Sequence, residues 1–271
     1  MSDVTAHYAG SGALIDGIRA ALTGAGVTLE GVPTTALAPV DEFHIRGRAA
    51  TLEIAEALQV HADSHVLDMG SGLGGPARTL AEVVGCRVTG VDLTPEFCDV
   101  AVELSQWTGL SDRTQFEVGD ATALDSPPAA FDAAMTIHAA MNIADKPAMY
   151  REARRVLKPG GRFVVYDVLQ GPGGDVRYPV PWARDPADSH LATTEQMRTL
   201  LAEAGFSVIS ETDSSTASRE WFAAVAARIA ETGPPPVTFA AFLGADFAPM
   251  ARNQVENLSE DRIRTVTFVC V

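Results

Sequence analysis

The sequence has 271 residues, enough for one large α/β domain or two small ones. Apolar residues make up 46% of it and charged residues 20%, a composition typical of globular proteins and unlike that of disordered chains. Twenty basic and 35 acidic residues give a formal net charge of −15, so the chain lacks the cationic excess with which proteins bind nucleic acid, and we expect no nucleic-acid partner.

The order of the predicted elements indicates an α/β fold. Two amphipathic segments come first, Ala13–Thr23 and Gly47–Leu58, and predict a helical cap within residues 1–60. From residue 65 on, short β-branched runs alternate with amphipathic segments, as in βαβ units on a mostly parallel sheet. The predicted strands are His65–Gly70, Arg87–Leu93, Thr114–Asp120, Phe131–His138, Gly161–Leu169, Phe206–Asp213 and Arg262–Val271. The predicted helices are Gly75–Val84, Pro95–Thr108, Lys146–Leu157, Thr194–Ala204 and Ala217–Glu231, with a further helical stretch to about Leu258.

The helix predicted at Lys146–Leu157 carries start and stop signals at both ends. Asp145 is placed to cap its first backbone N–H groups, and Pro147 suits the first turn, where an N–H is not needed. Gly160 and Gly161 end it. These signals agree with one another, so we expect this helix at these residues.

Residues 171–186, GPGGDVRYPVPWARDP, are too rich in Gly and Pro for regular structure and predict a long loop. Loops of this length inside a compact domain are uncommon and often functional. We therefore predict a domain over residues 61–271 that carries two lid insertions, at about residues 171–192 and 214–258.

A glycine turn follows the first predicted strand, within the sequence HVLDMGSGLGG of residues 65–75. Gly70, Gly72 and Gly75 satisfy the pattern G-x-G-x-x-G of dinucleotide-binding proteins, because residues without Cβ let the backbone turn tightly and approach a ligand closely. Asp92, 20 positions after Gly72, is placed to accept hydrogen bonds from ribose hydroxyls. These residues leave two classes open, a nicotinamide-dependent reductase and an enzyme with another nucleoside ligand.

Three further features favour the second class. Asp68, beside the turn, would repel a pyrophosphate but attract a ligand that carries an ammonium and a sulfonium. Asp120 ends the third predicted strand, where it can accept a hydrogen bond from an adenine amino group. The sequence LKPGGRF at residues 157–163 predicts a tight turn into the fifth strand.

Together the segments VLDMGSGLGG, VTGVDLTP, VGDA and LKPGGRF resemble, in order and spacing, those of class I S-adenosylmethionine-dependent methyltransferases. The resemblance covers about residues 44–213 and extends to the small-molecule branch with the ubiquinone/menaquinone, tocopherol, sarcosine and natural-product sugar methyltransferases. It implies a Rossmann-like, doubly wound sheet of seven strands, mostly parallel, with an antiparallel last strand inserted beside the sixth.

The resemblance also implies which residues hold S-adenosylmethionine. Asp68, Gly70, Ser71 and Gly72 would contact its methionine moiety. The residues for the ribose, the adenine and the boundary with the acceptor would be, in that order, Asp92 with Leu93, Asp120 with Ala121, and Ile137 with His138.

Two histidines are candidate catalytic bases, which are needed only if the acceptor is protonated at the working pH. His138 follows the fourth strand at its C-terminal edge, where such folds bind ligands. His44, in DEFHIRGR, lies in a stretch that resembles one packed over the cofactor in related enzymes, and Arg46 beside it would pair with a carboxylate of cofactor or substrate. The alternatives are a packing histidine at 138 and a helix start with solvated charges at 44–48.

Further candidates lie in the cap and the insertions. His7 and Tyr8 are candidate members of the lid. Asp185, Asp188 and His190 predict a solvated polar loop rather than a metal site, so we expect no metal. Four aromatic residues of the insertions are candidates for contact with the substrate, with core packing as the alternative: Tyr178, Trp182, Trp221 and Phe222.

The location is expected to be cytoplasmic. Residues 1–5 show no basic region leading into an apolar run, and no run approaches the ~20 apolar residues of a membrane helix, so we expect no membrane association. The cysteines, Cys86, Cys98 and Cys270, are too few and too widely spaced for a disulfide framework.

The sequence thus predicts methyl transfer to an oxygen or nitrogen of a small molecule, of the kind found in secondary metabolism, by a monomer or homodimer. C-methylation of a terpenoid or quinone is the nearest alternative. A nicotinamide-dependent reductase and a non-catalytic cofactor-binding subunit stay open as more distant ones.

Overall fold

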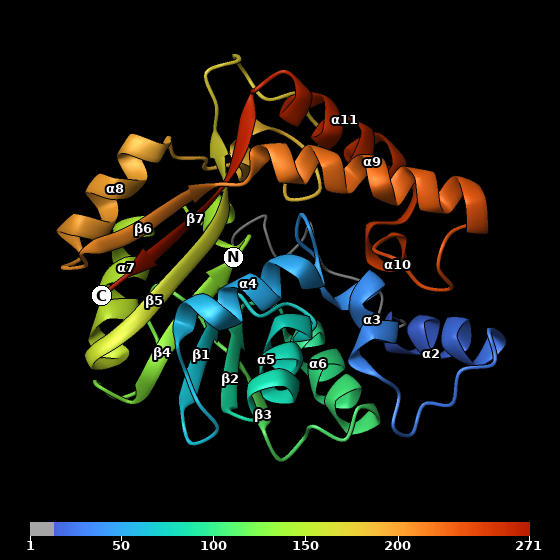
Figure 1. Ribbon diagram of the computed structural model, residues 1–271, viewed down its shortest axis with the longest axis horizontal. Coiled ribbons are helices and arrows are strands. Elements are labelled where there is room, and N and C mark those ends of the chain that lie inside the picture. The colour runs from blue at the N-terminus through green and yellow to red at the C-terminus, as the bar shows by residue number, and fades with distance from the viewer. Residues whose placement is uncertain (1–13) are drawn as a thin grey trace.

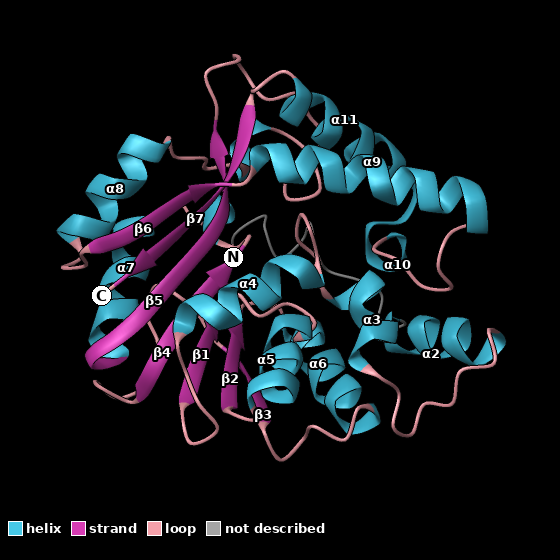
Figure 2. Ribbon diagram, in the orientation of Figure 1, coloured by secondary structure: helices cyan, strands magenta, loops and turns pink. Residues whose placement is uncertain are grey.

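The computed structural model describes residues 14–271, and their seven strands form one sheet in the order β3-β2-β1-β4-β5-β7-β6 (Figure 1; Figure 2). The first five strands pair in parallel, and β7 lies antiparallel between β5 and β6. This confirms the predicted fold class. The strands are β1 (His65–Met69), β2 (Arg87–Asp92), β3 (Thr114–Val118), β4 (Phe131–Ile137), β5 (Leu157–Gln170), β6 (Val208–Asp213) and β7 (Ile263–Cys270).

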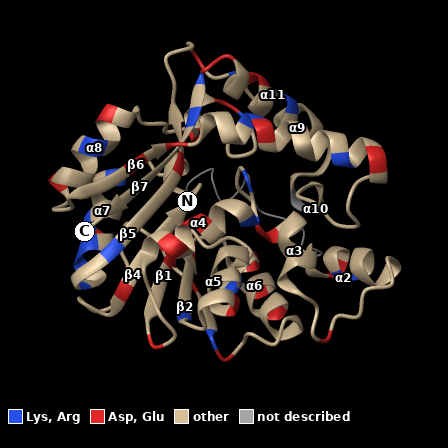
Figure 3. Cartoon of the chain, viewed as in Figure 1, with Lys and Arg blue, Asp and Glu red and all other residues tan. Residues whose placement is uncertain are grey.

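Helices cover both faces of the sheet. In chain order they are α2 (Leu14–Gly24), α3 (Thr34–Asp41), α4 (Arg48–Leu58), α5 (Gly75–Val84), α6 (Pro95–Trp107), α7 (Lys146–Val156), α8 (Thr194–Glu203), α9 (Ser215–Thr232), α10 (Ala240–Leu243) and α11 (Phe247–Ser259). Acidic residues occur on helices and loops throughout the molecule (Figure 3). No helix in the described part of the chain has the length and apolarity to cross a bilayer.

Alternation along β1 explains the two layers. Val66 packs with α4 and α5 in one buried cluster, whereas Leu67 and Met69 pack with α7 in the other. Successive strand residues point to opposite faces, so a strand covered on both sides is apolar almost throughout. The polar exception, Asp68, stands near the end of this buried strand.

The structure corrects the predicted boundaries in two places. Helix α3 was not predicted, because Pro39 interrupts its sequence and its apolar periodicity is short. Strand β5 begins at Leu157, where we predicted a tight turn, and an irregularity in its pairing with β4 absorbs the glycines there. The capping of α7 is confirmed, since Asp145 accepts a hydrogen bond from the Ala148 N–H at 3.0 Å.

Helix α3 packs so closely on the start of α5 that only glycine fits at position 75. A Cβ added to Gly75 would overlap the backbone carbonyl of Asp41. We expect Gly75→Ala to lower the free energy of unfolding by about 1–3 kcal/mol, the usual cost of overpacking a core. Urea denaturation measures this cost. Gly17 of α2 is the matched control, because it has open space around it and an alanine there should raise stability by up to ~1 kcal/mol.

Candidate active site

One cavity of about 460 Å³ lies at the carboxyl ends of β1, β2 and β4. The neighbours of β1 in the sheet, β2 and β4, lead into connections that diverge from this point, which is where open α/β sheets bind ligands. All ten residues predicted to hold the cofactor line this cavity, together with the candidate base His44: Asp68, Gly70, Ser71, Gly72, Asp92, Leu93, Asp120, Ala121, Ile137 and His138.

The glycine turn forms one wall of the cavity. Gly70 has a φ of 81°, and a Cβ on it would overlap the side chain of Ala139, so the turn and the β4 connection meet through this glycine. Gly72 has a φ of 52° with open space around it, and its N–H donates to Asp92 Oδ2 at 2.8 Å. The turn thus leaves its backbone open to a ligand and fixes the carboxylate that ends β2.

Asp68 is buried, and its Oδ2 has no hydrogen-bond partner among the described residues. Burial, together with the charges of Asp92 and Glu42, raises its pKa to about 8. An unpaired buried carboxyl group is costly unless a ligand satisfies it. Its position in the cavity wall therefore suits a cationic group of a ligand.

The two acids on the neighbouring strands differ in burial. Burial raises the pKa of Asp92, and the hydrogen bonds from the N–H groups of Thr94 and Gly72 oppose this rise without cancelling it. Asp120, exposed after β3, accepts at Oδ1 from the Thr122 N–H and hydroxyl, at 2.8 and 2.7 Å. Leu93 is 44% exposed beside them, although it is large and apolar. Two carboxylates and an uncovered apolar surface match the hydroxyls and the flat base of a nucleoside.

The candidate bases His44 and His138 share a second wall with Tyr166. The ring centroids of the two histidines are 5.9 Å apart, and those of His138 and Tyr166 are 4.8 Å apart. Burial lowers the pKa of His44 to about 4, and burial with the charge of His44 lowers that of His138 well below its usual value. Both imidazoles are therefore neutral at physiological pH and able to accept a proton.

The two histidines differ in backbone conformation and in the hydrogen bonds of their ring nitrogens. His138 has a φ of 50°, which is uncommon for a residue other than glycine, and its N–H donates to the Tyr166 carbonyl at 2.8 Å. Its Nε2 is buried without a protein partner among the described residues. The Nε2–H of His44 donates to the Gly47 carbonyl at 2.9 Å, which leaves Nδ1 as the acceptor nitrogen.

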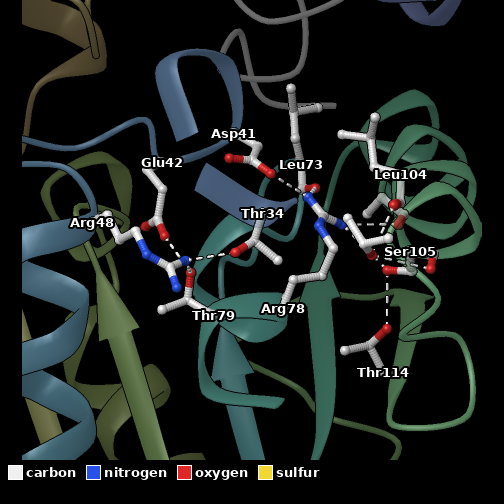
Figure 4. Close-up of polar contacts among 12 residues, drawn as sticks. Thr34, Asp41, Glu42, Arg48, Leu73, Arg78, Thr79, Leu104, Ser105 and Thr114 are labelled. Atoms are coloured by element: carbon white, nitrogen blue, oxygen red, sulfur yellow. Dashed lines mark hydrogen bonds and ion pairs between the residues drawn. The ribbon is translucent and has the colours of Figure 1, made fainter. Parts of the chain in front are cut away.

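A buried polar network surrounds Asp41, Glu42 and Arg78, the first two of which lie close to His44 in the sequence (Figure 4). The guanidinium of Arg78 donates to Asp41 Oδ2 at 2.8 Å, and both side chains are at most 1% exposed. Burial raises the pKa of Asp41 to about 6, opposed by the charge of Arg78. Glu42 accepts from the hydroxyls of Thr51 and Thr79, both at 2.6 Å. The network joins α3 and α4 to α5, so the helical cap is bonded to the helix that follows the glycine turn.

The structure places the five predicted substrate residues outside the lining of this cavity. Arg46 pairs with Glu53. Trp182 is 1% exposed and donates to Ser189 Oγ, in an apolar cluster that also contains Tyr178 and Phe222. Trp221 contacts Phe222 and lies 3.8 Å from the Cβ position of Gly47. The positions of the four aromatic residues match the alternative of packing, and His7 and Tyr8 lie outside the described residues.

Several lining residues were not among the predicted ones, notably Asp41, Phe43 and Asn142, and the polar loop residues Asp188 and His190 also reach the cavity. Asn142 donates to the Trp182 carbonyl at 2.6 Å and thus holds the loop against the end of β4. The sequence TIHAAMN gave a signal here, since it leaves a strand at the ligand-binding edge with a polar residue.

A buried lysine fixes the same loop. Lys146, at the start of α7, is 5% exposed and donates to the carbonyls of Ile143, at 2.9 Å, and of His190. Because burial lowers its pKa while Asp167 opposes this, the ammonium is balanced by a neighbouring carboxyl group. The loop is therefore held in place by the β4–α7 segment and forms a fixed wall of the cavity.

Residues 67–165 match the protein family described as Methyltransferase domain. Methyltransferase GfsG of Streptomyces halstedii is 34% identical over 130 residues, 48% of this chain and 47% of that protein. Sterol 24-C-methyltransferase ERG6B of Gibberella zeae is 37% identical over 116 residues, 43% of this chain and 30% of that protein. The chain thus spans less than half the length of these curated relatives.

Two solved structures share the fold over most of the chain. Phosphoethanolamine N-methyltransferase 2 of Haemonchus contortus, in complex with phosphomonomethylethanolamine and S-adenosylhomocysteine, has a TM-score of 0.73 and 22% identity over 93% of this chain and 60% of that one. The [4+2]-cyclase SpnF has a TM-score of 0.66 and 25% identity over 96% of this chain and 94% of that one.

Proposed function

We propose that this protein transfers the methyl group of S-adenosylmethionine to an oxygen or nitrogen of a small molecule, because residues 67–165 match the family described as Methyltransferase domain. The observation that carries the proposal is the convergence of Asp68, Asp92 and Asp120 from three strands on one cavity beside the glycine turn. The cap and the two insertions, at about 171–192 and 214–258, would enclose the acceptor. We further propose that the protein is cytoplasmic and acts as a monomer or homodimer.

The residues present fit this cofactor. Asp68, with its unpartnered Oδ2, and Ser71, with its buried unpartnered Oγ, would hold the methionine moiety together with Gly70 and Gly72. The ribose, the adenine and the boundary with the acceptor would be held, in that order, by Asp92 with Leu93, Asp120 with Ala121, and Ile137 with His138. Bound there, the cofactor would supply a methyl group carried on a sulfonium. The sulfur that loses this methyl group would leave as a neutral thioether.

The protein's part is alignment, exclusion of water and movement of a proton. The fixed loop wall and the apolar residues Phe43 and Ile143 limit water around the acceptor. A neutral His138, or His44 through Nδ1, would accept the proton that a hydroxyl or ammonium acceptor must lose. A nucleophile that carries no such proton needs neither histidine.

C-methylation of a terpenoid or quinone is the second candidate, and the sterol C-methyltransferase among the relatives favours it. A nicotinamide-dependent reductase is less compatible with the cavity, because the buried Asp68 would face a pyrophosphate. A protein that binds the cofactor without methyl transfer is a third possibility, to which the cyclase with this fold is relevant.

Calorimetric titration tests the proposal directly. We expect S-adenosylmethionine and S-adenosylhomocysteine to bind and NADH not to bind. Single-turnover assays with radiolabelled cofactor and a panel of amines, phenols and terpenoids then separate O-, N- and C-methylation. Binding of NADH alone would contradict the proposal, and tight cofactor binding without transfer to any acceptor would favour the non-catalytic alternative.

Cofactor binding should depend on pH through Asp68. With a pKa of about 8, this carboxyl group is mostly protonated at pH 7 and ionised above pH 8, so a cationic ligand must displace its proton at neutral pH. We expect the affinity for S-adenosylmethionine to rise by about tenfold from pH 7 to pH 9, with a proton released on binding. Calorimetry in buffers of different ionisation enthalpy measures the release. In Asp68→Asn the affinity should depend on pH only through the ligand's own amino group. Identical pH profiles of the variant and the wild type would contradict the assignment of Asp68 to cofactor binding.

A further inference from the structure

We propose that the acceptor carries no negative charge and is a largely apolar, uncharged molecule. This inference rests on the proposed function, because it names the class of molecule that shares the cavity with the cofactor. It is carried by the charges that line the cavity and by the bonds that hold the nearest cations.

Six aspartates line the cavity: Asp41, Asp68, Asp92, Asp120, Asp145 and Asp188. Among the described residues that line it there is no Lys or Arg, and the sequence of residues 1–13 contains neither residue type. Asp41 and Asp68 are at most 3% exposed and Asp68 Oδ2 has no protein partner among the described residues, whereas Asp120 and Asp145 are exposed. Ionised carboxylates in the cavity wall repel an anionic acceptor, and Asp68 adds to this repulsion above its pKa of about 8.

The cations behind the cavity wall are already committed to protein partners. Arg78 donates to Asp41 and to the backbone of Leu73 and Ala101. Lys146 donates to the carbonyls of Ile143 and His190. A phosphate or carboxylate in the cavity could gain one of these cations as a partner only by breaking its buried interactions, which would leave the former partner unpaired in the interior.

A cationic acceptor is not favoured either. Asp41 is held by Arg78, and Asp145 Oδ1 accepts from the Ala148 N–H, so these two carboxylates are occupied. The methyl donor is itself a cation, so it repels a second cation placed beside it. The lining also contains apolar or neutral side chains: Phe43, Ile137, Ile143, Ala144, Ala187 and Asn142.

The proposed uncharged acceptor differs from phosphomonomethylethanolamine, the phosphate-bearing molecule bound by the Haemonchus contortus protein. A matched test uses neutral and anionic probes of the same shape: 2-naphthol with 2-naphthyl phosphate, and geraniol with geranyl phosphate. Affinity is measured by calorimetry on the full chain, both alone and with saturating S-adenosylhomocysteine. We expect each neutral probe to bind at least about tenfold more tightly than its phosphate partner.

A charge variant isolates the cause. Asp188→Lys places a cation at the cavity wall and should reduce the preference for the neutral probe by about tenfold or more, mainly through tighter binding of the phosphate. Glu203→Lys, at the exposed end of α8, makes the same change in net charge outside the cavity lining and should leave the preference unchanged. An equal effect of both variants would show that the overall charge, not the cavity, sets the preference, and would overturn the proposal.

Two other results would also overturn it: wild-type protein that binds the phosphate probes as tightly as the neutral ones, or that binds none of the neutral probes. Failure of the proposed function is distinguished by the first titration. A protein that does not bind S-adenosylhomocysteine fails as a methyltransferase, whereas one that binds it and prefers the phosphates fails only this inference.

Discussion

Replacing Asp68 with asparagine is expected to weaken the binding of S-adenosylmethionine by about 10- to 100-fold. The carboxylate stands at the glycine turn with Oδ2 unpartnered within the described protein, so a cationic ligand is its natural partner. Hydrogen bonds to charged groups contribute about 1.5–3 kcal/mol, which corresponds to this range of affinity. Asparagine keeps the shape of the side chain and removes its charge, so the loss reports the electrostatic part alone.

Titration calorimetry at pH 8.5, where Asp68 is largely ionised, measures the change. Asp63→Asn is the matched control, because Asp63 is exposed before β1 and outside the lining of the cavity. We expect the Asp68 variant to fold, since removing a buried unpaired charge does not cost stability. An affinity equal to that of the wild type would mean that position 68 does not face the cofactor, and the cavity would then need another ligand.

The sequence was sufficient to predict the residues at the strand ends that line the cavity, because strand ends are geometrically constrained. Asp68, Asp92 and Asp120 each stand at or near the end of a predicted parallel strand, and the carboxyl ends of such strands meet at one edge of the sheet. A boundary error of one or two residues does not change that edge. Their convergence on one cavity therefore followed from strand order alone.

The part of the cavity lining that comes from loops and from the cap could not be predicted in this way. Tyr178 and Trp182 lie in a loop, where no periodicity indicates the direction of a side chain, and the structure buries Trp182 in an apolar cluster. Asp41 lines the cavity from α3, whose internal proline concealed the helix. Arg46, just before α4, is directed by its ion pair with Glu53 of that helix. A ligand would have to compete with Glu53 for the guanidinium. Such choices between packing and ligand contact depend on tertiary neighbours.

Replacing His138 with asparagine is expected to lower the rate of methyl transfer to a hydroxyl or amine acceptor by about 10²- to 10⁴-fold, the usual contribution of a general base. Asparagine is the informative substitution because it tolerates the left-handed backbone of this position, with its φ of 50°, better than alanine does. The variant therefore removes the imidazole and leaves the turn after β4 in place. Binding of S-adenosylhomocysteine should change by no more than about twofold.

Single-turnover rates with an acceptor found by the panel assay measure the loss, with His61→Asn, an exposed position outside the cavity lining, as the control. Because burial holds the pKa of His138 well below its usual value, the wild-type rate should not fall as the pH decreases from 8 to 6. The same loss in His44→Asn with a normal rate in His138→Asn would assign the proton to the Nδ1 of His44. Normal rates in both variants would mean that the acceptor needs no base, as for a nucleophile that is already deprotonated in the cavity.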